Sequence, residues 1–210
     1  MVTPLSATGT KANELMSVLP IYLYGTDVLR KKAKPVQSLD DSTIKLMMDM
    51  AETMRKANGV GLAATQVGDL RRMLVLDISA IERGEDDGDE RSEEAGKEAK
   101  ILVAINPEIL QEEGKLQMEE GCLSIPDLRA EVTRAEKIKV KFRDANFDEV
   151  VMEADGLLGR AFLHEIDHLN GVMFVDHLNL GRRTLLKNEL RKIKNGEVDT
   201  AYPVISANEA

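Results

Sequence analysis

The sequence predicts an α+β protein in which antiparallel or mixed β-sheets pack around a central helix, with a further helix near the C-terminus. Three observations support this prediction. Alternating apolar residues of the kind found in strands dominate residues 101–151, helical periodicity occurs on both sides of them, and the chain has no internal repeat.

The composition indicates one compact globular domain. The chain has 210 residues, of which 43% are apolar and 31% are charged. No apolar run approaches the roughly 20 residues that a membrane span needs. The net charge of −9 argues against nonspecific nucleic-acid binding by the body of the domain.

We divide the chain into three parts. Residues 1–15 are expected to be a disordered or extraneous extension, residues 16–195 a single catalytic domain, and residues 196–210 a C-terminal tail. Within the domain, residues 82–99 are acidic and aperiodic and are expected to form a surface loop. The first 15 residues lack a secretory signal and contain one basic residue, so we expect a cytoplasmic protein rather than an organellar one.

The N-terminal part of the domain predicts two helices. Thr26 can cap a short helix over Asp27–Ala33, and Asp40 or Asp41 can cap a longer one that ends near Asn58. The longer helix has a regular apolar face, made of Ile44, Met47, Met48, Ala51 and Met54.

The middle of the chain predicts strands. The run within Arg72–Ile78 is apolar at successive positions, which indicates burial on both faces. Ile101–Ile105 is a second strand, which Asn106-Pro107 is expected to break. Residues 115–151 show strand-like alternation with a turn at residues 144–146.

Two helices are predicted after these strands. The first covers Leu157–Leu169, with Gly171 as its stop signal, and the second covers Gly181–Asn195. Leu185, Leu186, Leu190 and Ile193 are expected to lie on one side of the second helix.

The first of these helices carries the pattern HExxH. His164 and His168 lie one helical turn apart and can bind one divalent ion together, while Glu165 can take a proton from metal-bound water. The chain has only three histidines, so two of them in this pattern indicate a metal-dependent hydrolase.

A catalytic site of this kind needs a third protein ligand. Phe174 stands where a metzincin has its third histidine, so that pattern fails. Glu189 lies where a gluzincin-like metallopeptidase could use it, but it sits among basic residues as an ordinary surface charge would. Cys122 has no cysteine partner for a disulfide and follows Gly121, which favours it as the third ligand. A structural metal-binding module without catalysis is the alternative from another class.

Three segments together resemble the peptide deformylase family. The first is Gly59-Val60-Gly61-Leu62-Ala63-Ala64-Thr65-Gln66, the second is Glu120-Gly121-Cys122-Leu123-Ser124, and the third is His164 to His168 with an aspartate before the second histidine. The resemblance extends from about Met16 to about Asn195.

The resemblance implies the roles of individual residues. Cys122, His164 and His168 would bind the metal, which is commonly Fe²⁺ with Zn²⁺, Ni²⁺ or Co²⁺ as substitutes. Glu165 would be the general base and acid, and the Gln66 side chain and the Leu123 N–H would form the oxyanion hole.

The resemblance also implies a substrate, the N-formyl-methionine end of a nascent polypeptide, from which formate would be released. The peptide would pair as an added strand beside Val60, Gly61 and Gly121, with Arg129 near the exit. The pocket for the methionine side chain would be bordered by Val60, Glu120, Leu157 and Ala161. Asp167 could orient a metal ligand, through Arg134.

A basic stripe covers residues 181–195, with six cationic side chains against the single acidic Glu189. This stripe suggests the ribosome as a second partner, through its RNA near the nascent-chain exit. We expect neither sequence-specific nucleic-acid binding nor membrane association.

Overall fold

The computed structural model describes residues 16–83 and 100–210. The predicted extension over residues 1–15 and nearly all of the predicted acidic loop lie outside the described residues. In the described part, no helix combines the length and the apolar character that a membrane crossing requires.

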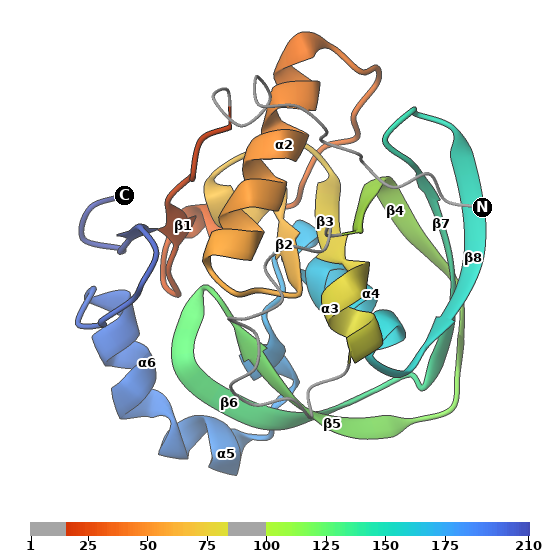
Figure 1. The fold of residues 1–210 in the computed structure, drawn as a ribbon. Coiled ribbons are helices and arrows are strands. Elements are labelled where there is room, and N and C mark those ends of the chain that lie inside the picture. The colour runs from red at the N-terminus through yellow and green to blue at the C-terminus, as the bar shows by residue number, and fades with distance from the viewer. Residues whose placement is uncertain (1–15, 84–99) are drawn as a thin grey trace.

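The main sheet has five strands in the order β2-β3-β4-β7-β8, and every neighbouring pair is antiparallel. Its strands are β2 (Gly61–Ala63), β3 (Met73–Asp77), β4 (Ile101–Glu113), β7 (Lys137–Arg143) and β8 (Glu149–Asp155). The predicted two-sided burial of β3 is confirmed, because Met73 to Leu76 are all 0% exposed. Figure 1 shows this sheet extending from β2 and β3 at the centre of the molecule to β7 and β8 at its right side.

Two smaller sheets complete the β structure. β5 (Leu116–Cys122) and β6 (Ile125–Arg134) form an antiparallel hairpin, and β1 (Ile21–Tyr22) pairs in parallel with β9 (Val204–Ile205). The predicted α+β class with antiparallel sheets and C-terminal helices is therefore confirmed, although none of the sheets in the described residues is mixed.

The predicted break at Asn106-Pro107 is wrong, because β4 continues through it. The register between β4 and β7 shifts between Ile105 and Glu108, and Asn106 has a positive φ of 53°. This irregularity accommodates Pro107, which has no N–H to donate to a ladder. The Asn106 side chain replaces the lost pairing with bonds to the N–H and C=O of Val36, both 2.8 Å long.

The helix α2 (Asp41–Lys56) begins as predicted. The Asp40 side chain accepts a hydrogen bond from the Thr43 N–H at 2.7 Å, which satisfies an otherwise unpaired donor of the first turn. Met47, Ala51 and Met54 are buried as expected, but Ile44 is 40% exposed because the buried face is centred on Met47, Met50 and Met54.

Two other helical predictions need correction. The segment predicted as the helix Asp27–Ala33 forms only a 3-10 turn over Asp27–Arg30, because the Ala33 N–H bonds instead to the Leu169 carbonyl. The helix α3 (Ile78–Arg83) was not predicted. It covers the last residue of the predicted strand Arg72–Ile78 and extends into the predicted surface loop over residues 82–99.

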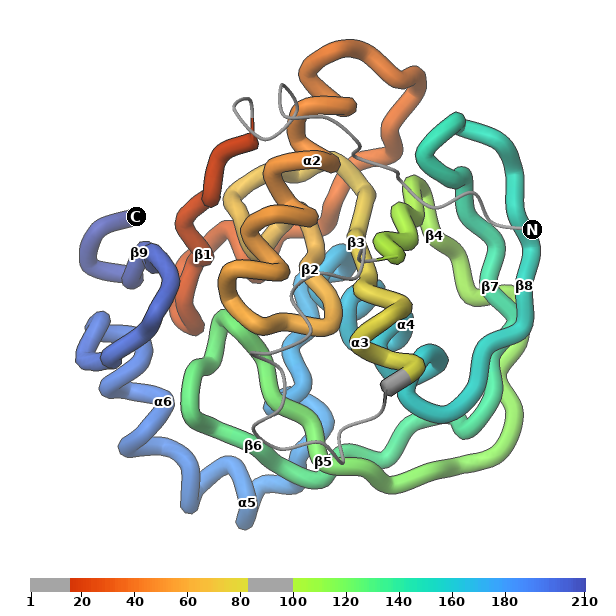
Figure 2. The backbone as a smooth tube through the Cα atoms, viewed as in Figure 1, coloured from red at the N-terminus to blue at the C-terminus, as the bar shows by residue number. Residues whose placement is uncertain are grey.

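The helix α4 (Gly156–Leu169) packs against β2, β3, β7 and β8. Gly159 permits the close approach to β8, because a Cβ there would lie 3.0 Å from the Ala154 carbonyl oxygen. Figure 2 shows α4 behind β2 and β3, with α2 on the other side of these strands. Buried side chains fill both interfaces.

The C-terminal helix is divided into α5 (Leu180–Leu185) and α6 (Lys187–Lys194), with Leu186 between them. Leu190 and Ile193 are buried as predicted. Leu185 is 80% exposed, which contradicts its predicted place on the buried side, because the interruption at Leu186 changes the direction of the apolar face.

The sequence analysis separated residues 196–210 as a tail. In the structure this segment returns to the domain, where the N–H groups of Ile21 and Leu23 donate to the carbonyls of Pro203 and Ile205, both at 2.9 Å. The pairing of β1 with β9 therefore places the C-terminal segment beside the chain's first strand (Figure 1).

Phe162→Ala is expected to lower the free energy of unfolding by about 3–5 kcal/mol. Phe162 is 0% exposed, and its ring centroid lies 5.7 Å from that of Phe142, so truncation leaves a cavity between α4 and β7. Urea unfolding measures the change. Val151→Ala is the control, because Val151 is 47% exposed, and an equal loss in both variants would contradict the expectation.

Candidate active site

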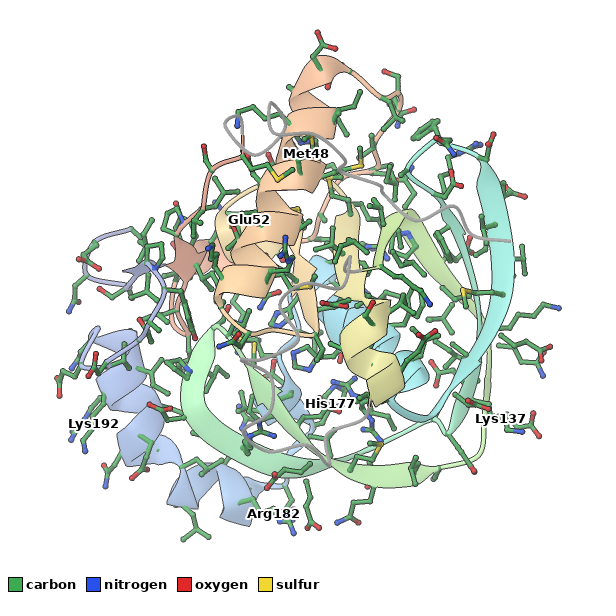
Figure 3. All side chains as sticks on the ribbon, in the orientation of Figure 1. Met48, Glu52, Lys137, His177, Arg182 and Lys192 are labelled. Atoms are coloured by element: carbon green, nitrogen blue, oxygen red, sulfur yellow. The ribbon has the colours of Figure 1, made fainter. Side chains whose placement is uncertain are left out.

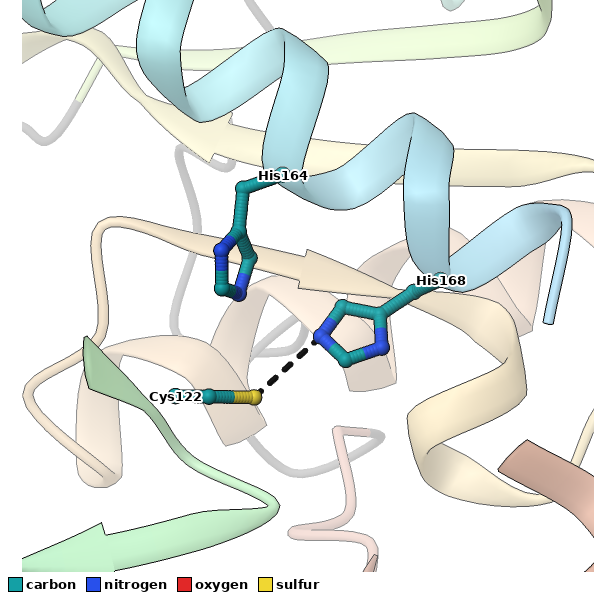
Figure 4. Close-up of side chains that lie close together, drawn as sticks. All are labelled: Cys122, His164 and His168. Carbon is teal, nitrogen blue, oxygen red and sulfur yellow. Dashed lines mark hydrogen bonds between the residues drawn. The ribbon is translucent and has the colours of Figure 1, made fainter. Parts of the chain in front are cut away.

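Three potential metal ligands converge between β5 and α4. The Sγ of Cys122 and one ring nitrogen of each of His164 and His168 all lie within 4.8 Å of one another. Cys122 Sγ is 3.2 Å from His168 Nε2. Figure 4 shows both imidazole rings projecting from the same side of α4 toward Cys122 at the end of β5. One thiolate and two imidazoles at these separations fit a single divalent ion.

The His164 ring is held from behind by Glu120. Glu120 Oε2 lies 2.9 Å from His164 Nδ1, so the other ring nitrogen, Nε2, is available for an ion. Burial opposes ionisation of Glu120, but hydrogen bonds with His164 and Arg134 outweigh it and hold the pKa of this carboxyl well below its ordinary value. Glu120 therefore remains an anion that orients the ring.

Two buried arginines hold the Glu120 carboxylate. Arg134 donates to both of its oxygens, at 2.6 and 3.0 Å, and Arg160 donates to Oε1 at 2.8 Å. Arg160 also donates to the carbonyls of Val132 and Leu116, at 3.0 and 2.6 Å. Because Arg160 belongs to α4, these bonds fasten the histidine-bearing helix to the hairpin that carries Cys122.

Asp167 extends this charged network toward solvent. Its Oδ2 accepts hydrogen bonds from Arg134, at 2.5 Å, and lies 2.7 Å from His177 Nε2. The hypothesis that Asp167 acts through Arg134 therefore has a structural basis, since Arg134 joins Asp167 to Glu120 and so to His164.

Glu165 is a buried carboxyl beside the three ligands. It is 4% exposed, and its Oε2 has no hydrogen-bond partner among the described residues. Burial raises the pKa of Glu165 to about 7. Gly61 provides the space for this side chain, because a Cβ at that position would lie 2.5 Å from Glu165 Oε1. A buried carboxyl with one unpaired oxygen in such a place is suited to exchange protons near neutral pH.

The Gln66 side chain lies beside the sulfur of Cys122. Its Oε1 accepts from the Ala63 N–H at 2.8 Å, which leaves Nε2 directed toward Cys122 Sγ, at 3.6 Å, and Ser124 Oγ, at 3.3 Å. An amide donor fixed in this way can stabilise a negatively charged oxygen with little reorganisation.

These groups face a cleft of about 410 Å³. β2 is the outermost strand of the main sheet and β5 belongs to a two-stranded hairpin, so each has an edge that no other described strand pairs with. Val60 directs its carbonyl to the Asp77 N–H, at 3.0 Å. An extended peptide that binds here would therefore pair with Gly61 rather than with the Val60 carbonyl.

The structure brings the predicted site residues together. All except His168, which is 1% exposed, line the cleft: Val60, Gly61, Gln66, Glu120, Gly121, Cys122, Leu123, Arg129, Leu157, Ala161, His164 and Glu165. Glu189 is exposed on α6 and lies outside both the ligand group and the cleft lining. The geometry therefore favours Cys122 over Glu189 as the third ligand.

The sequence analysis missed two parts of the site. Arg160 was hidden in the apolar pattern of α4, although a lone cation on that buried face was a usable signal. Residues 199–202 also line the cleft, and nothing in their sequence indicated that the chain returns to the site.

A single-ion site with three protein ligands, next to a buried carboxyl and an accessible cleft, defines a metal-dependent hydrolase. The family model described as polypeptide deformylase matches residues 18–184, and the chain belongs to this family. It is accordingly an enzyme that removes the N-formyl group from nascent polypeptides.

Individual relatives agree with this assignment. The peptide deformylase of Salinibacter ruber is 44% identical over 195 residues, which cover 91% of this chain and 96% of the relative. The crystal structure of a peptide deformylase from Legionella pneumophila has a TM-score of 0.73 and 38% identity, covering 86% of this chain and 98% of that one. The peptide deformylase from Ehrlichia chaffeensis in complex with actinonin has a TM-score of 0.72 and 35% identity, covering 88% and 100%.

Proposed function

We propose that this chain deformylates N-formyl-methionyl peptides with one divalent ion held by Cys122, His164 and His168, and with Glu165 as general base and acid. Fe²⁺ is the proposed ion, with Zn²⁺, Ni²⁺ or Co²⁺ as substitutes. The observation that carries the proposal is the buried Glu165 carboxyl beside the three ligands, whose Oε2 has no hydrogen-bond partner among the described residues. When bound, the ion supplies polarisation of the formyl carbonyl and acidification of water.

Glu165 moves the proton in this mechanism. Its carboxylate accepts a proton from water as the formyl carbon is attacked, and the resulting acid delivers it to the departing amine. Its pKa of about 7 suits both roles, because a group that titrates near the working pH can gain and lose a proton readily. Helix α4 carries this group and two ligands, and we propose it as the element around which the catalytic centre is organised.

The Gln66 side-chain amide and the Leu123 backbone N–H are the proposed oxyanion donors. Both lie next to Cys122: the Gln66 amide is 3.6 Å from its sulfur, and Leu123 is the following residue. Donors fixed before the reaction stabilise developing negative charge without paying for solvent rearrangement.

The peptide is proposed to bind as a strand along Gly61 and Gly121, in the cleft between β2 and β5. Val60, Glu120, Leu157 and Ala161 would border the methionine side chain, with Arg129 near the exit. The proposal is supported by the presence of all these residues in one cleft lining. Within the chain, residues 16–195 are the proposed catalytic domain, and the cytoplasm is the proposed location.

The proposed substrate predicts discrimination between acyl groups. A formyl group is the smallest acyl group, so we expect formate release from a formyl-methionyl peptide and at least about a hundredfold lower kcat/KM for its acetyl counterpart, because misplacement by about 1 Å costs that much. Formate release and appearance of the free amine measure the two reactions after anaerobic purification. Equal rates on both substrates would contradict the proposed specificity.

The basic surface of α5 and α6 is proposed to bind ribosomal RNA near the nascent-chain exit. Arg182 and Lys192 lie at the outer edge of these helices (Figure 3). Arg182 is ion-paired with Glu131 at 2.9 Å, whereas Lys187, Arg191 and Lys192 are exposed on α6.

Reversal of Lys187, Arg191 and Lys192 to glutamate is expected to weaken ribosome binding and to reduce its salt dependence, because fewer counterions are released. Co-sedimentation with ribosomes over a range of salt concentrations measures both effects. Lys31, Lys32 and Lys137 reversed together are the control, since they are also exposed. Unchanged binding by the α6 variant would refute the proposed contact.

A further inference from the structure

The C-terminal segment forms part of the substrate cleft. Asp199, Thr200, Ala201 and Tyr202 contribute to its lining, together with residues of β2, β5 and α4. The segment is held there on two sides, since Ile21 and Leu23 bond to its carbonyls and the Ala207 N–H donates to the Lys194 carbonyl at 3.2 Å. These backbone bonds give it a defined position relative to the metal ligands.

Tyr202 connects this segment to the residue after Cys122. Its hydroxyl donates a hydrogen bond to the Leu123 carbonyl at 2.9 Å. Tyr202 and Leu123 are both half-buried and pack against the same core cluster, which contains Met54 and Leu62. Burial also raises the pKa of Tyr202 to about 12, so the hydroxyl retains its proton at neutral pH.

Leu123 and Ser124 form the turn between β5 and β6. The register of the hairpin shifts between Gly121 and Cys122, so the ladder pairing does not determine this turn alone. Three further contacts hold it: the Tyr202 bond to the Leu123 carbonyl, the Tyr24 N–H donating to the Ser124 carbonyl at 2.8 Å, and Gln66 donating to Ser124 Oγ. Each contact comes from a different part of the chain.

We infer that Tyr202 is a positioning residue. Its bond to the Leu123 carbonyl fixes the backbone of Leu123, so that the N–H of the same residue points to the developing oxyanion. The inference rests on the proposed role of the Leu123 N–H. The hydroxyl acts through the backbone and does not itself touch the reacting atoms. Loss of the bond allows the Leu123 peptide groups to rotate, which weakens transition-state stabilisation more than substrate binding.

Tyr202→Phe tests this inference because it removes only the hydroxyl. We expect kcat for formate release to fall about tenfold, the scale of one ordinary hydrogen bond, with KM unchanged. Metal content should remain unchanged, and Tm should fall by no more than the roughly 2–4 °C that one hydrogen bond contributes, because the ring still packs against the core. Tyr22→Phe is the matched control, since Tyr22 lies on β1, which pairs with β9, and outside the cleft lining.

Gln66→Ala serves as the reference variant, because it removes the other proposed oxyanion donor and should lower kcat by about 10²–10³-fold. If Gln66→Ala loses activity and Tyr202→Phe keeps full kcat, the inference is wrong and the proposed oxyanion hole stands. If both variants keep full kcat, the oxyanion hole itself is wrong. Loss of metal, or a fall in Tm much larger than one hydrogen bond explains, would also overturn the inference, because it would assign Tyr202 a structural role.

Discussion

Cys122→Ser is expected to remove the metal and to lower formate release by more than about a hundredfold. Loss of a residue that only hydrogen-bonds a metal ligand usually costs about 10–100-fold, and loss of the ligand itself should cost more. A serine hydroxyl retains its proton near neutral pH and is a hard donor, whereas the cysteine binds as a soft thiolate. In cobalt-substituted protein, a thiolate-to-metal charge-transfer band should be present and should disappear in the variant. Metal analysis of the purified proteins supplies the second measurement.

Glu189→Ala is the matched control for the cysteine substitution. Glu189 is exposed on α6 and outside the ligand group, so this variant should retain the ion, the charge-transfer band and the activity. Loss of metal from Glu189→Ala, with no thiolate band in the unsubstituted protein, would instead support the gluzincin-like ligand set.

Glu165→Ala is expected to keep its metal while formate release falls by about 10²–10⁴-fold, the usual contribution of general acid–base catalysis. The three ligands are unaltered by this change, and only the proton acceptor is lost. We also expect no decrease in Tm, because the wild-type fold buries a carboxyl oxygen that has no hydrogen-bond partner in the described part of the chain. Formate release, metal content and thermal unfolding of one preparation test the three expectations together.

Glu153→Ala controls for the loss of a carboxylate, since Glu153 is exposed on β8. If deformylation by Glu165→Ala equals that of the control, the proton-transfer mechanism is wrong. Metal bound with no formate release from the unsubstituted protein would leave the non-catalytic metal module as the remaining alternative.

The local parts of the site could be predicted because they depend on spacing within one element. His164 and His168 are one turn apart in a helix, and this relation holds wherever the helix lies in the fold. The prediction of α2 from Asp40 and the buried Met73–Leu76 run succeeded for the same reason.

Features that depend on distant segments could not be derived from periodicity. Periodicity could not indicate the approach of Cys122 to the histidines, since 42 positions separate it from His164. Its lack of a disulfide partner, the preceding Gly121 and the family resemblance indicated it instead. The continuation of β4 past Pro107 depends on Asn106 bonding to Val36, which is remote in sequence. The return of Tyr202 to Leu123 depends on the β1–β9 pairing, and a two-residue strand gives no periodic signal.

The arrangement of Glu120, Arg134 and Arg160 has a consequence for how this sequence can change during evolution. Replacing Glu120 alone leaves Arg160 without its buried anion and Arg134 with Asp167 alone, and isolating a buried charge such as Arg160 costs about 3–5 kcal/mol. The same replacement frees the His164 ring, so stability and metal affinity decline in one step. Viable lineages should therefore exchange these three positions as a set, and a single substitution at any of them should be purged before its partners can adapt.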